Sequence, residues 1–201
     1  MSLEILAKLL GQVVPFDPLT GLPNRKRLRD RLRQAIRLAR RIRQSSVGIL
    51  FIDLDHFKAI NDTYGHAVGD AVLIEIAARL RACLRESDMI ARLGGDEFVA
   101  LLGHLRNSED TVIVAERILN ACTRPIIVAE QVCQISASLG LAVWPFDGET
   151  VDELLQNADR AMYASKDEGR NTLRFYDRNM KWRNAMAQRR FPIEQACGWI
   201  S

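Results

Sequence analysis

The chain has 201 residues, enough for one domain of ordinary size with a hydrophobic core. Hydrophobic residues make up 48% and charged residues 26%, which excludes a disordered or fibrous chain. No apolar run approaches the ~20 residues that cross a bilayer. The formal net charge of +3 does not by itself indicate nucleic-acid binding, and we expect neither a nucleic-acid partner nor membrane contact by this segment.

The four cysteines are widely spaced and lack metal-ligand spacing, so we expect reduced thiols, the first three of them in core-like segments: Cys83, Cys122, Cys133 and Cys197. The start, Met1-Ser2-Leu3-Glu4, does not have the pattern of a signal peptide. We therefore expect a cytoplasmic location, with the alternative that the chain is a soluble piece of a longer, membrane-anchored protein.

Residues 1–16 are predicted to form a segment that leads into the domain. Heptad-like spacing of Leu3, Leu6, Leu10 and Val13 resembles the end of a coiled coil or signalling helix. The alternative is a frayed terminus. A loop rich in proline and glycine follows, and Asn24 is a plausible N-cap for the next helix.

The helix predicted over residues 25–44 is dense in arginine. A basic helix is one feature of nucleic-acid binding proteins. Here no aromatic residue is interleaved to stack on bases, so we favour a solvated face that covers the edge of the core.

The remaining pattern predicts strands and helices in mixed order. Strands are expected at 47–53, 89–92, 98–102, 132–143 and 172–176, and helices at 57–62, 70–85, 108–121 and 151–167. The second and third strands form a hairpin around Leu93 and a glycine pair. This order predicts an α+β domain, with helices covering a central, mostly antiparallel sheet.

Acidic residues gather at the end of the first strand and in the hairpin turn. Asp53 ends a buried strand, where a carboxylate is costly unless it is paired, solvated or bound to metal. Asp55 is expected to face the same side of the strand. The turn adds Asp96 and Glu97 after Gly94 and Gly95, which allow close approach of the backbone to a phosphate. Each acid alone is more often structural, but together they form a suitable magnesium site.

The run Gly94-Gly95-Asp96-Glu97-Phe98 matches the signature of the GGDEF domains, the diguanylate cyclases. Three other stretches resemble the same family in order and spacing: the loop Asp17–Arg25, the stretch from Asp53 to Asp70, and the helix at Ala158–Tyr163 with the residues up to Asn171. The resemblance spans residues 17–177. It implies a nucleotide-cyclase, palm-like fold with a ferredoxin-like core.

This resemblance implies an enzyme that joins two GTP molecules into cyclic di-GMP and releases two pyrophosphates. Each domain would bind one GTP, so activity would require a homodimer, and the N-terminal segment could set the pairing. The cofactor would be Mg²⁺ or Mn²⁺, two ions per active site.

The family pattern also assigns roles to individual residues. The metal ligands would be Asp53, Asp96, Glu97 and the carbonyl of Leu54. Asp96 would be the base for the attacking 3′-hydroxyl, with Glu97 and Lys58 also catalytic. The residues expected to bind substrate are Asn61, His66, Asp70, Gly94, Gly95, Lys166 and Arg170.

Within this set, Asn61 and Asp70 would read guanine, and Lys58, Lys166 and Arg170 would hold the triphosphate. His66 is equally well interpreted as a structural histidine of its loop. For Asp55 we favour a structural hydrogen-bonding role over direct ligation.

A second site is expected upstream of the glycines. Arg85 and Asp88 match the family's inhibitory Arg-x-x-Asp pattern five residues before the glycine pair, with Arg117 as an additional contact. The alternative is a surface ion pair of little energetic value. The pattern at this offset predicts inhibition by the product.

Residues 178–201 extend past the resemblance and loosely resemble a connector toward an EAL phosphodiesterase domain, or else an extension that docks on its own domain. The main alternative function is a catalytically silent GGDEF module that binds GTP or cyclic di-GMP and regulates an attached domain. A cyclase or polymerase with another base preference is disfavoured by Asn61 and Asp70. The intact signature favours catalysis.

Overall fold

The computed structural model describes residues 15–42, 45–105 and 109–178. Nearly all of the predicted N-terminal segment 1–16, nearly all of the C-terminal connector 178–201, and Cys197 lie outside these described residues. None of the described helices has both the length and the apolar character that a membrane span requires.

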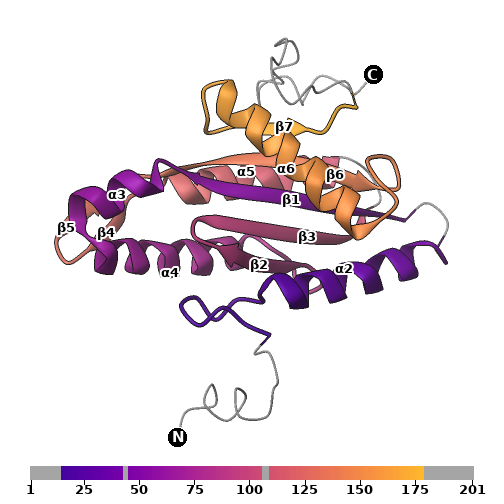
Figure 1. Ribbon diagram of the computed structural model, residues 1–201, viewed down its shortest axis with the longest axis horizontal. Coiled ribbons are helices and arrows are strands. Elements are labelled where there is room, and N and C mark those ends of the chain that lie inside the picture. Colours follow the sequence, from indigo (N-terminus) through magenta and orange to yellow (C-terminus); the bar gives the residue numbers. More distant parts are fainter. Residues whose placement is uncertain (1–14, 43–44, 106–108, 179–201) are drawn as a thin grey trace, which may run out of the picture.

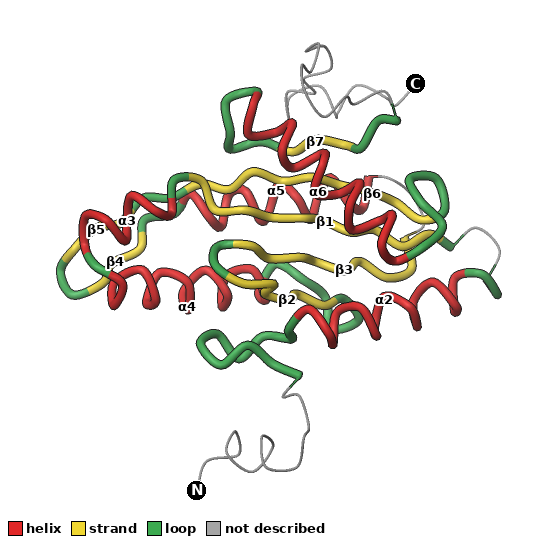
Figure 2. Tube along the Cα trace, viewed as in Figure 1, coloured by secondary structure: helices red, strands yellow, loops and turns green. Residues whose placement is uncertain are grey.

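A five-stranded sheet forms the centre of the domain (Figures 1 and 2). Its order is β2-β3-β1-β6-β7, and every neighbouring pair is antiparallel except the parallel pair β6–β7. The strands span Met89–Gly94 (β2), Glu97–Leu105 (β3), Ser46–Asp55 (β1), Ser136–Trp144 (β6) and Leu173–Phe175 (β7). The predicted α+β class with a mostly antiparallel sheet is confirmed.

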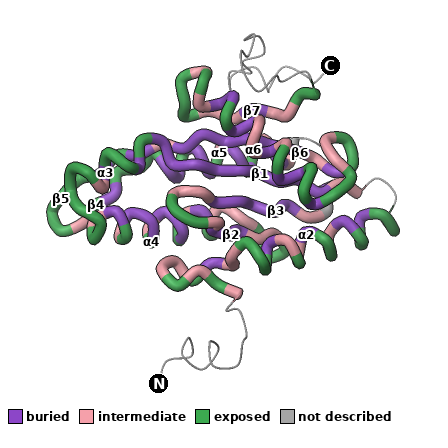
Figure 3. The backbone as a smooth tube through the Cα atoms, in the orientation of Figure 1, coloured by how far each residue is buried: buried purple, intermediate pink, exposed green. Residues whose placement is uncertain are grey.

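Helices cover both faces of the sheet, so its central strands are buried along most of their length (Figure 3). One face packs against α3 (Phe57–Tyr64), α4 (His66–Ala82) and α5 (Glu109–Thr123). The other face packs against α2 (Arg25–Ala39) and α6 (Val151–Asp167).

The side chains of β1 alternate between these two layers, as the period of a strand requires. Leu50, Ile52 and Leu54 join the core under α4 and α5. Residues at odd positions, such as Ile49 and Phe51, join the core under α2 and α6. Continuing the alternation, Asp53 and Asp55 point toward the layer of α2 and α6, on the same side as predicted.

Helix α6 is fixed at its start and against the sheet. Thr150 and Glu153 form a reciprocal capping box at its N-terminus. Gly140 of β6 lets the helix approach closely, because a Cβ there would stand 2.1 Å from the carbonyl oxygen of Ala158 and from the amide nitrogen of Met162. The close approach determines where the last turn of α6 lies over the sheet.

The ends of several elements differ from the prediction, most of all those of α2 and α4. Helix α2 ends at Ala39 rather than near residue 44, because the chain tightens into turns in which the N–H of Arg41 donates to Leu38 and that of Ile42 to Ala39. Helix α4 begins at His66 rather than at residue 70.

The predicted strand 132–143 is wrong as a single strand. It divides into β5 (Gln131–Cys133) and β6, and β5 pairs instead with β4 (Ile126–Val128), which the sequence pattern did not indicate. The expectation for the cysteines holds where the structure describes them, since Cys83, Cys122 and Cys133 are free thiols and the last two are buried.

Candidate active site

Asp53 and Glu97 lie directly opposite each other on neighbouring strands β1 and β3. Residues opposite each other in an antiparallel pair share one face of the sheet, so both carboxylates face the layer of α2 and α6. The Asp53 side chain is buried, with 6% of the residue exposed, and Glu97 is half-buried. The sheet thus brings together the strand-end acid and the hairpin acid that the sequence singled out.

The turn between β2 and β3 depends on its two glycines. Gly94 has a φ of 143° and Gly95 a φ of 52°, both in the region that favours glycine. The N–H of Leu54 donates to the carbonyl of Asp96 at 3.3 Å. The turn is therefore tied to the end of β1 through the backbone as well as through strand pairing.

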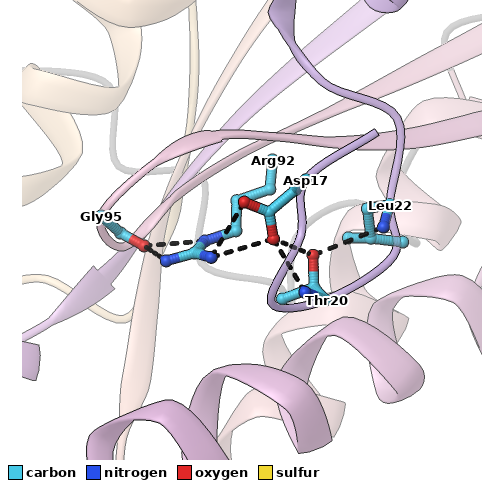
Figure 4. A network of polar contacts seen from close by, with 5 residues as sticks. All are labelled: Asp17, Thr20, Leu22, Arg92 and Gly95. Carbon is cyan, nitrogen blue, oxygen red and sulfur yellow. Dashed lines mark hydrogen bonds and ion pairs between the residues drawn. The ribbon is translucent and has the colours of Figure 1, made fainter. Parts of the chain in front are cut away.

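Arg92 fastens this turn to the N-terminal loop (Figure 4). Its guanidinium donates to the carbonyl of Gly95 at 2.8 and 3.0 Å and to the Asp17 carboxylate at 2.9 and 3.1 Å. Thr20 donates to Asp17 as well, from its N–H at 2.8 Å and its hydroxyl at 2.6 Å. Burial raises the pKa of Asp17, but the hydrogen bonds from Thr20 and Arg92 outweigh it and hold that pKa below its ordinary value.

Lys166, in the last turn of α6, forms an ion pair with Asp53, with Nζ 2.7 Å from Oδ1. Burial raises the pKa of the Asp53 carboxyl, the hydrogen bond and charge of Lys166 oppose this, and the charges of Asp96 and Asp55 add to it. The pKa of Asp53 is raised on balance, so one ammonium does not compensate fully for the burial and the neighbouring acids.

Asp55 has a structural role, as favoured from the sequence. Its carboxylate accepts hydrogen bonds from the hydroxyls of Ser136 at 2.6 Å and Ser138 at 2.7 Å, and from the N–H of Asn171 at 3.1 Å. The last contact holds the turn that follows α6, in which Arg170 and Asn171 both have positive φ. Asp55 therefore supports the segment that carries Lys166 and Arg170.

Two charged residues near these acids, Asp159 and Arg25, were not assigned to the site from the sequence. Burial raises the pKa of Glu97, and the charges of Asp159 and Asp53 raise it further against an opposing effect of Arg25. Burial also raises the pKa of Asp159, against Lys166 and Arg25. Asp159 precedes Lys166 by two helical turns, so the helical period could have indicated a shared face. Arg25 was expected at the start of its helix, but nothing local in the sequence indicates that its charge acts on Glu97 and Asp159.

The donor set fits a hard divalent cation. Mg²⁺ binds through one or two carboxylates and completes its shell with water and substrate phosphates. Asp53 and Glu97 lie opposite each other across the strand pair, and the charge of Asp96 raises the pKa of both, so three acids lie near one another here. In the part of the chain that the structure describes, no three histidine, cysteine or acidic side chains are already arranged to hold a metal ion.

The residues predicted to read guanine, together with Lys58 and His66, lie on α3 and at the start of α4. Asn61 packs against Gly69, where an added Cβ would stand 1.9 Å from its Oδ1. Lys58, His66 and Asp70 are exposed. These side chains extend from two adjoining helices beyond the end of β1, whereas Lys166 and the exposed Arg170 come from α6 and the turn after it.

Arg85 and Asp88, two of the three predicted inhibitory residues, lie just before the start of β2. A cavity of about 410 Å³ is lined by Arg85 and Asp88, among others, but not by Arg117. Asp88 accepts hydrogen bonds from the backbone N–H of Arg85 at 3.3 Å and of Gly103 at 3.2 Å. The surface ion pair weighed as an alternative is not formed, and the Arg85 side chain is exposed. Arg117 is exposed on α5. Burial raises the pKa of Cys83, two residues before Arg85, and the charge of Arg117 opposes this only in part.

Comparison with known proteins identifies the family of this fold and site. Residues 14–172 match the family model described as diguanylate cyclase, GGDEF domain. The chain is 47% identical over 192 residues to the bifunctional diguanylate cyclase/cyclic di-GMP phosphodiesterase MucR of Pseudomonas aeruginosa, covering 96% of this chain but 27% of that protein. The chain thus spans only about a quarter of the length of this relative.

Solved structures agree with this comparison. The crystal structure of the GGDEF domain of Pseudomonas aeruginosa TpbB superimposes with a TM-score of 0.77 at 42% identity, covering 80% of this chain and 99% of that one. The coiled coil and GGDEF domain of Caulobacter crescentus DgcB, in complex with cyclic di-GMP, gives a TM-score of 0.73 at 29% identity, covering 86% and 92%. The chain therefore belongs to the GGDEF domain family of diguanylate cyclases.

Proposed function

We propose that this domain condenses two GTP molecules into cyclic di-GMP, with release of two pyrophosphates. The observation that carries the proposal is the pairing of Asp53 with Glu97 across β1 and β3, beside Asp96 and facing the cation of Lys166. The family's established reaction needs this combination of carboxylates for metal and cations for phosphate. The relative MucR, which carries a diguanylate cyclase activity in its name, supports the same assignment.

The reaction in this proposal is an in-line displacement at phosphorus. The 3′-oxygen of one GTP attacks the α-phosphorus of the other, an O–P bond forms, and the bond to pyrophosphate breaks; a second such step closes the ring. Asp96 accepts the proton of the attacking hydroxyl. Two Mg²⁺ or Mn²⁺ ions, held by Asp53, Asp96, Glu97 and the Leu54 carbonyl, supply Lewis-acid stabilisation when bound.

The other residues bind and orient the nucleotide. Lys58, Lys166 and Arg170 neutralise the triphosphate, with lysine acting as a point charge and arginine as a fork. Asn61 and Asp70 hydrogen-bond the guanine edge, while His66 lies at the start of α4 on the same side. Gly94 and Gly95 expose backbone N–H groups at a turn that a phosphate can approach.

Each chain carries one set of these residues, and the reaction needs two nucleotides facing each other. We therefore propose that the active form is a homodimer with the two sites opposed. Because GTP is the substrate, we also place the domain in the cytoplasm.

We further propose that the product inhibits the enzyme at Arg85 and Asp88, with Arg117 as an additional contact. Two features support this: Arg85 is exposed, and Asp88 is held in place by two backbone N–H groups at the edge of a cavity. The relative DgcB has been crystallised in complex with cyclic di-GMP.

Incubation of the purified protein with GTP and Mg²⁺, followed by chromatography, tests the proposal. Cyclic di-GMP and pyrophosphate are expected in a ratio of one to two, and Asp96→Asn should abolish both. Asp30→Asn, which alters only an exposed ion pair with Arg33, is the matched control and should retain activity. If a dimeric wild-type protein binds GTP without making product, the domain is instead a silent binding module.

A further inference from the structure

We propose that the ammonium of Lys166 takes the place of the divalent cation at Asp53 until nucleotide binds, and then transfers to the triphosphate. This inference rests on the proposed function, because it assigns a metal to Asp53 and a triphosphate to Lys166. The inference adds that Asp53 can bind Lys166 or the metal ion, but not both at once. Lys166 therefore competes with the metal ion for the Asp53 carboxylate.

The surroundings of Asp53 show why a cation is needed there. The side chain is buried at the end of β1, and in the described part of the chain its polar contact is the one from Lys166 at 2.7 Å. Asp55, two residues on, differs in that three hydrogen-bond donors already satisfy it. A buried carboxylate that loses its charged partner is strongly destabilising. While it is ionised, Asp53 therefore requires either Lys166 or a metal ion.

The charges around the pair favour exchange over permanent pairing. Asp96 adds to the negative potential at Asp53, and Asp159 and Glu97 belong to the same acidic cluster. A single positive charge compensates this cluster less well than a divalent ion does.

Lys166 is placed so that it can leave. It lies in the last turn of α6 and is partly exposed, with 26% of its side chain accessible, whereas the Asp53 side chain is only 9% accessible. Its flexible stem and compact charge allow it to change partners without movement of the helix. When GTP brings its phosphates and a metal ion, the metal takes Asp53 and Lys166 takes the phosphates, so every charge stays compensated. Metal alone offers Lys166 no new partner and should bind weakly.

Titration with Mn²⁺ in the absence of nucleotide, followed by the electron paramagnetic resonance signal of the free ion, tests the exchange. Lys166→Met should bind Mn²⁺ at least about tenfold more tightly than the wild type, because the competing charge is removed. Arg170→Met is the matched control: it removes another cation assigned to the triphosphate, but one without a contact to Asp53, and should leave Mn²⁺ affinity unchanged. Equal, weaker or undetectable binding by Lys166→Met overturns the inference.

Thermal unfolding gives a second, independent readout. Without metal, Lys166→Met should melt below the wild type, and added Mn²⁺ should raise its melting temperature more than that of the wild type. If Lys166→Met does not fold, Lys166→Gln, which keeps a hydrogen-bond donor but no charge, takes its place with the same expected gain in affinity. The double variant Asp53→Asn/Lys166→Met should recover stability and lose the tight binding; a gain that persists without Asp53 contradicts the exchange.

These measurements separate the exchange from the proposed function. Wild-type protein that makes no cyclic di-GMP contradicts the proposed reaction, whereas the exchange is decided by Mn²⁺ affinity alone. Conversely, an active enzyme whose Lys166→Met variant binds Mn²⁺ no more tightly retains the proposed function and loses the exchange.

Discussion

The guanidinium of Arg92 holds the carboxylate of Asp17 at 2.9 Å while it also donates to the carbonyl of Gly95 in the turn between β2 and β3. Only 9% of the Arg92 side chain and 15% of the Asp17 side chain are accessible, so solvent screens this ion pair poorly. The N-terminal loop and the turn are therefore parts of one rigid unit. The N–H of Arg92 also donates to the carbonyl of Pro23 at 3.0 Å, so the loop is bound to β2 through the backbone as well.

Asp17→Ala should destabilise the domain by about 3 kcal/mol, because it leaves the Arg92 charge buried without its partner. Turnover should fall as well, since the Gly95 carbonyl loses its fixed partner. Urea unfolding and GTP turnover check the two effects. Asp30→Ala is the control, because the Asp30–Arg33 pair is exposed and its loss should cost less than ~0.5 kcal/mol. Equal effects of the two substitutions would contradict the rigid unit.

Gly140→Ala tests the close approach of α6 to β6. A Cβ there meets backbone atoms of Ala158 and Met162, which cannot move away as a side chain can, so the cost should reach about 4 kcal/mol or more. Gly103→Ala, in β3, meets nothing within 4 Å and should be nearly neutral. Urea unfolding compares the two variants. A stable Gly140→Ala protein should still lose turnover, because Lys166 would shift relative to Asp53.

Much of the fold was predictable because its signals are local. The alternation along β1 predicts which residues face the same side, including Asp53 and Asp55, and the glycine pair predicts the hairpin. The break between β5 and β6 was not predictable: the stretch Gln131–Trp144 contains no proline, and its one glycine, Gly140, lies inside β6. The division depends on β5 pairing with β4, which is a tertiary contact.

Some features of the candidate site were predictable from the sequence, and others depend on tertiary packing. The carboxylates at the strand end and in the turn were grouped from the sequence by the family resemblance, and the pairing of β1 with β3 brings Asp53 and Glu97 opposite each other. The pairing of Lys166 with Asp53, the partners of Asp55 and the position of Arg25 depend on how α6, β6 and α2 dock on the sheet. No periodicity in the sequence encodes that docking.

Gly69→Ala should weaken GTP binding about tenfold or more while leaving the fold intact, because a displacement of about 1 Å in a positioning group is costly. The added Cβ meets the Oδ1 of Asn61, the residue proposed to read guanine, and would push it aside. The free energy of unfolding should change by less than ~1 kcal/mol, because the higher helix propensity of alanine offsets the cost of the contact with Asn61. Nucleotide titration and thermal unfolding measure the two effects. Ala78→Ser, exposed on α4, should change neither.

In the absence of divalent cations, the contribution of Asp53, Glu97 and Asp159 to the free energy of unfolding should fall as the pH rises from about 4 toward neutral. Asp53, Glu97 and Asp159 have pKa values raised above 3.8, 4.5 and 3.8 respectively by burial and by their acidic neighbours. The folded protein therefore binds protons more tightly than the unfolded chain does, and ionisation of these groups disfavours folding.

Glu97→Gln should make this fall shallower and should stabilise the protein at neutral pH, as measured by urea unfolding in EDTA. Asp152→Asn should act in the opposite sense: the hydrogen bond from Arg29 lowers the pKa of Asp152, so its contribution is present at neutral pH and is lost in acid. The two variants changing stability in the same direction at neutral pH would contradict this account of the acidic cluster.

Arg85→Ala should shift the inhibition curve for added cyclic di-GMP to higher concentration, by about tenfold or more if the guanidinium makes a charge-assisted contact with the product. Stability should not change, because the Arg85 side chain is exposed. Asp88→Ala should also weaken inhibition, but at a cost of about 1 to 2 kcal/mol, since Asp88 accepts from the N–H groups of Arg85 and Gly103. Ser87→Ala, exposed between the two, is the control for both measurements. An unchanged curve for Arg85→Ala would remove the basis for an inhibitory site here, and the role of Asp88 would then be only to hold the start of β2 against β3.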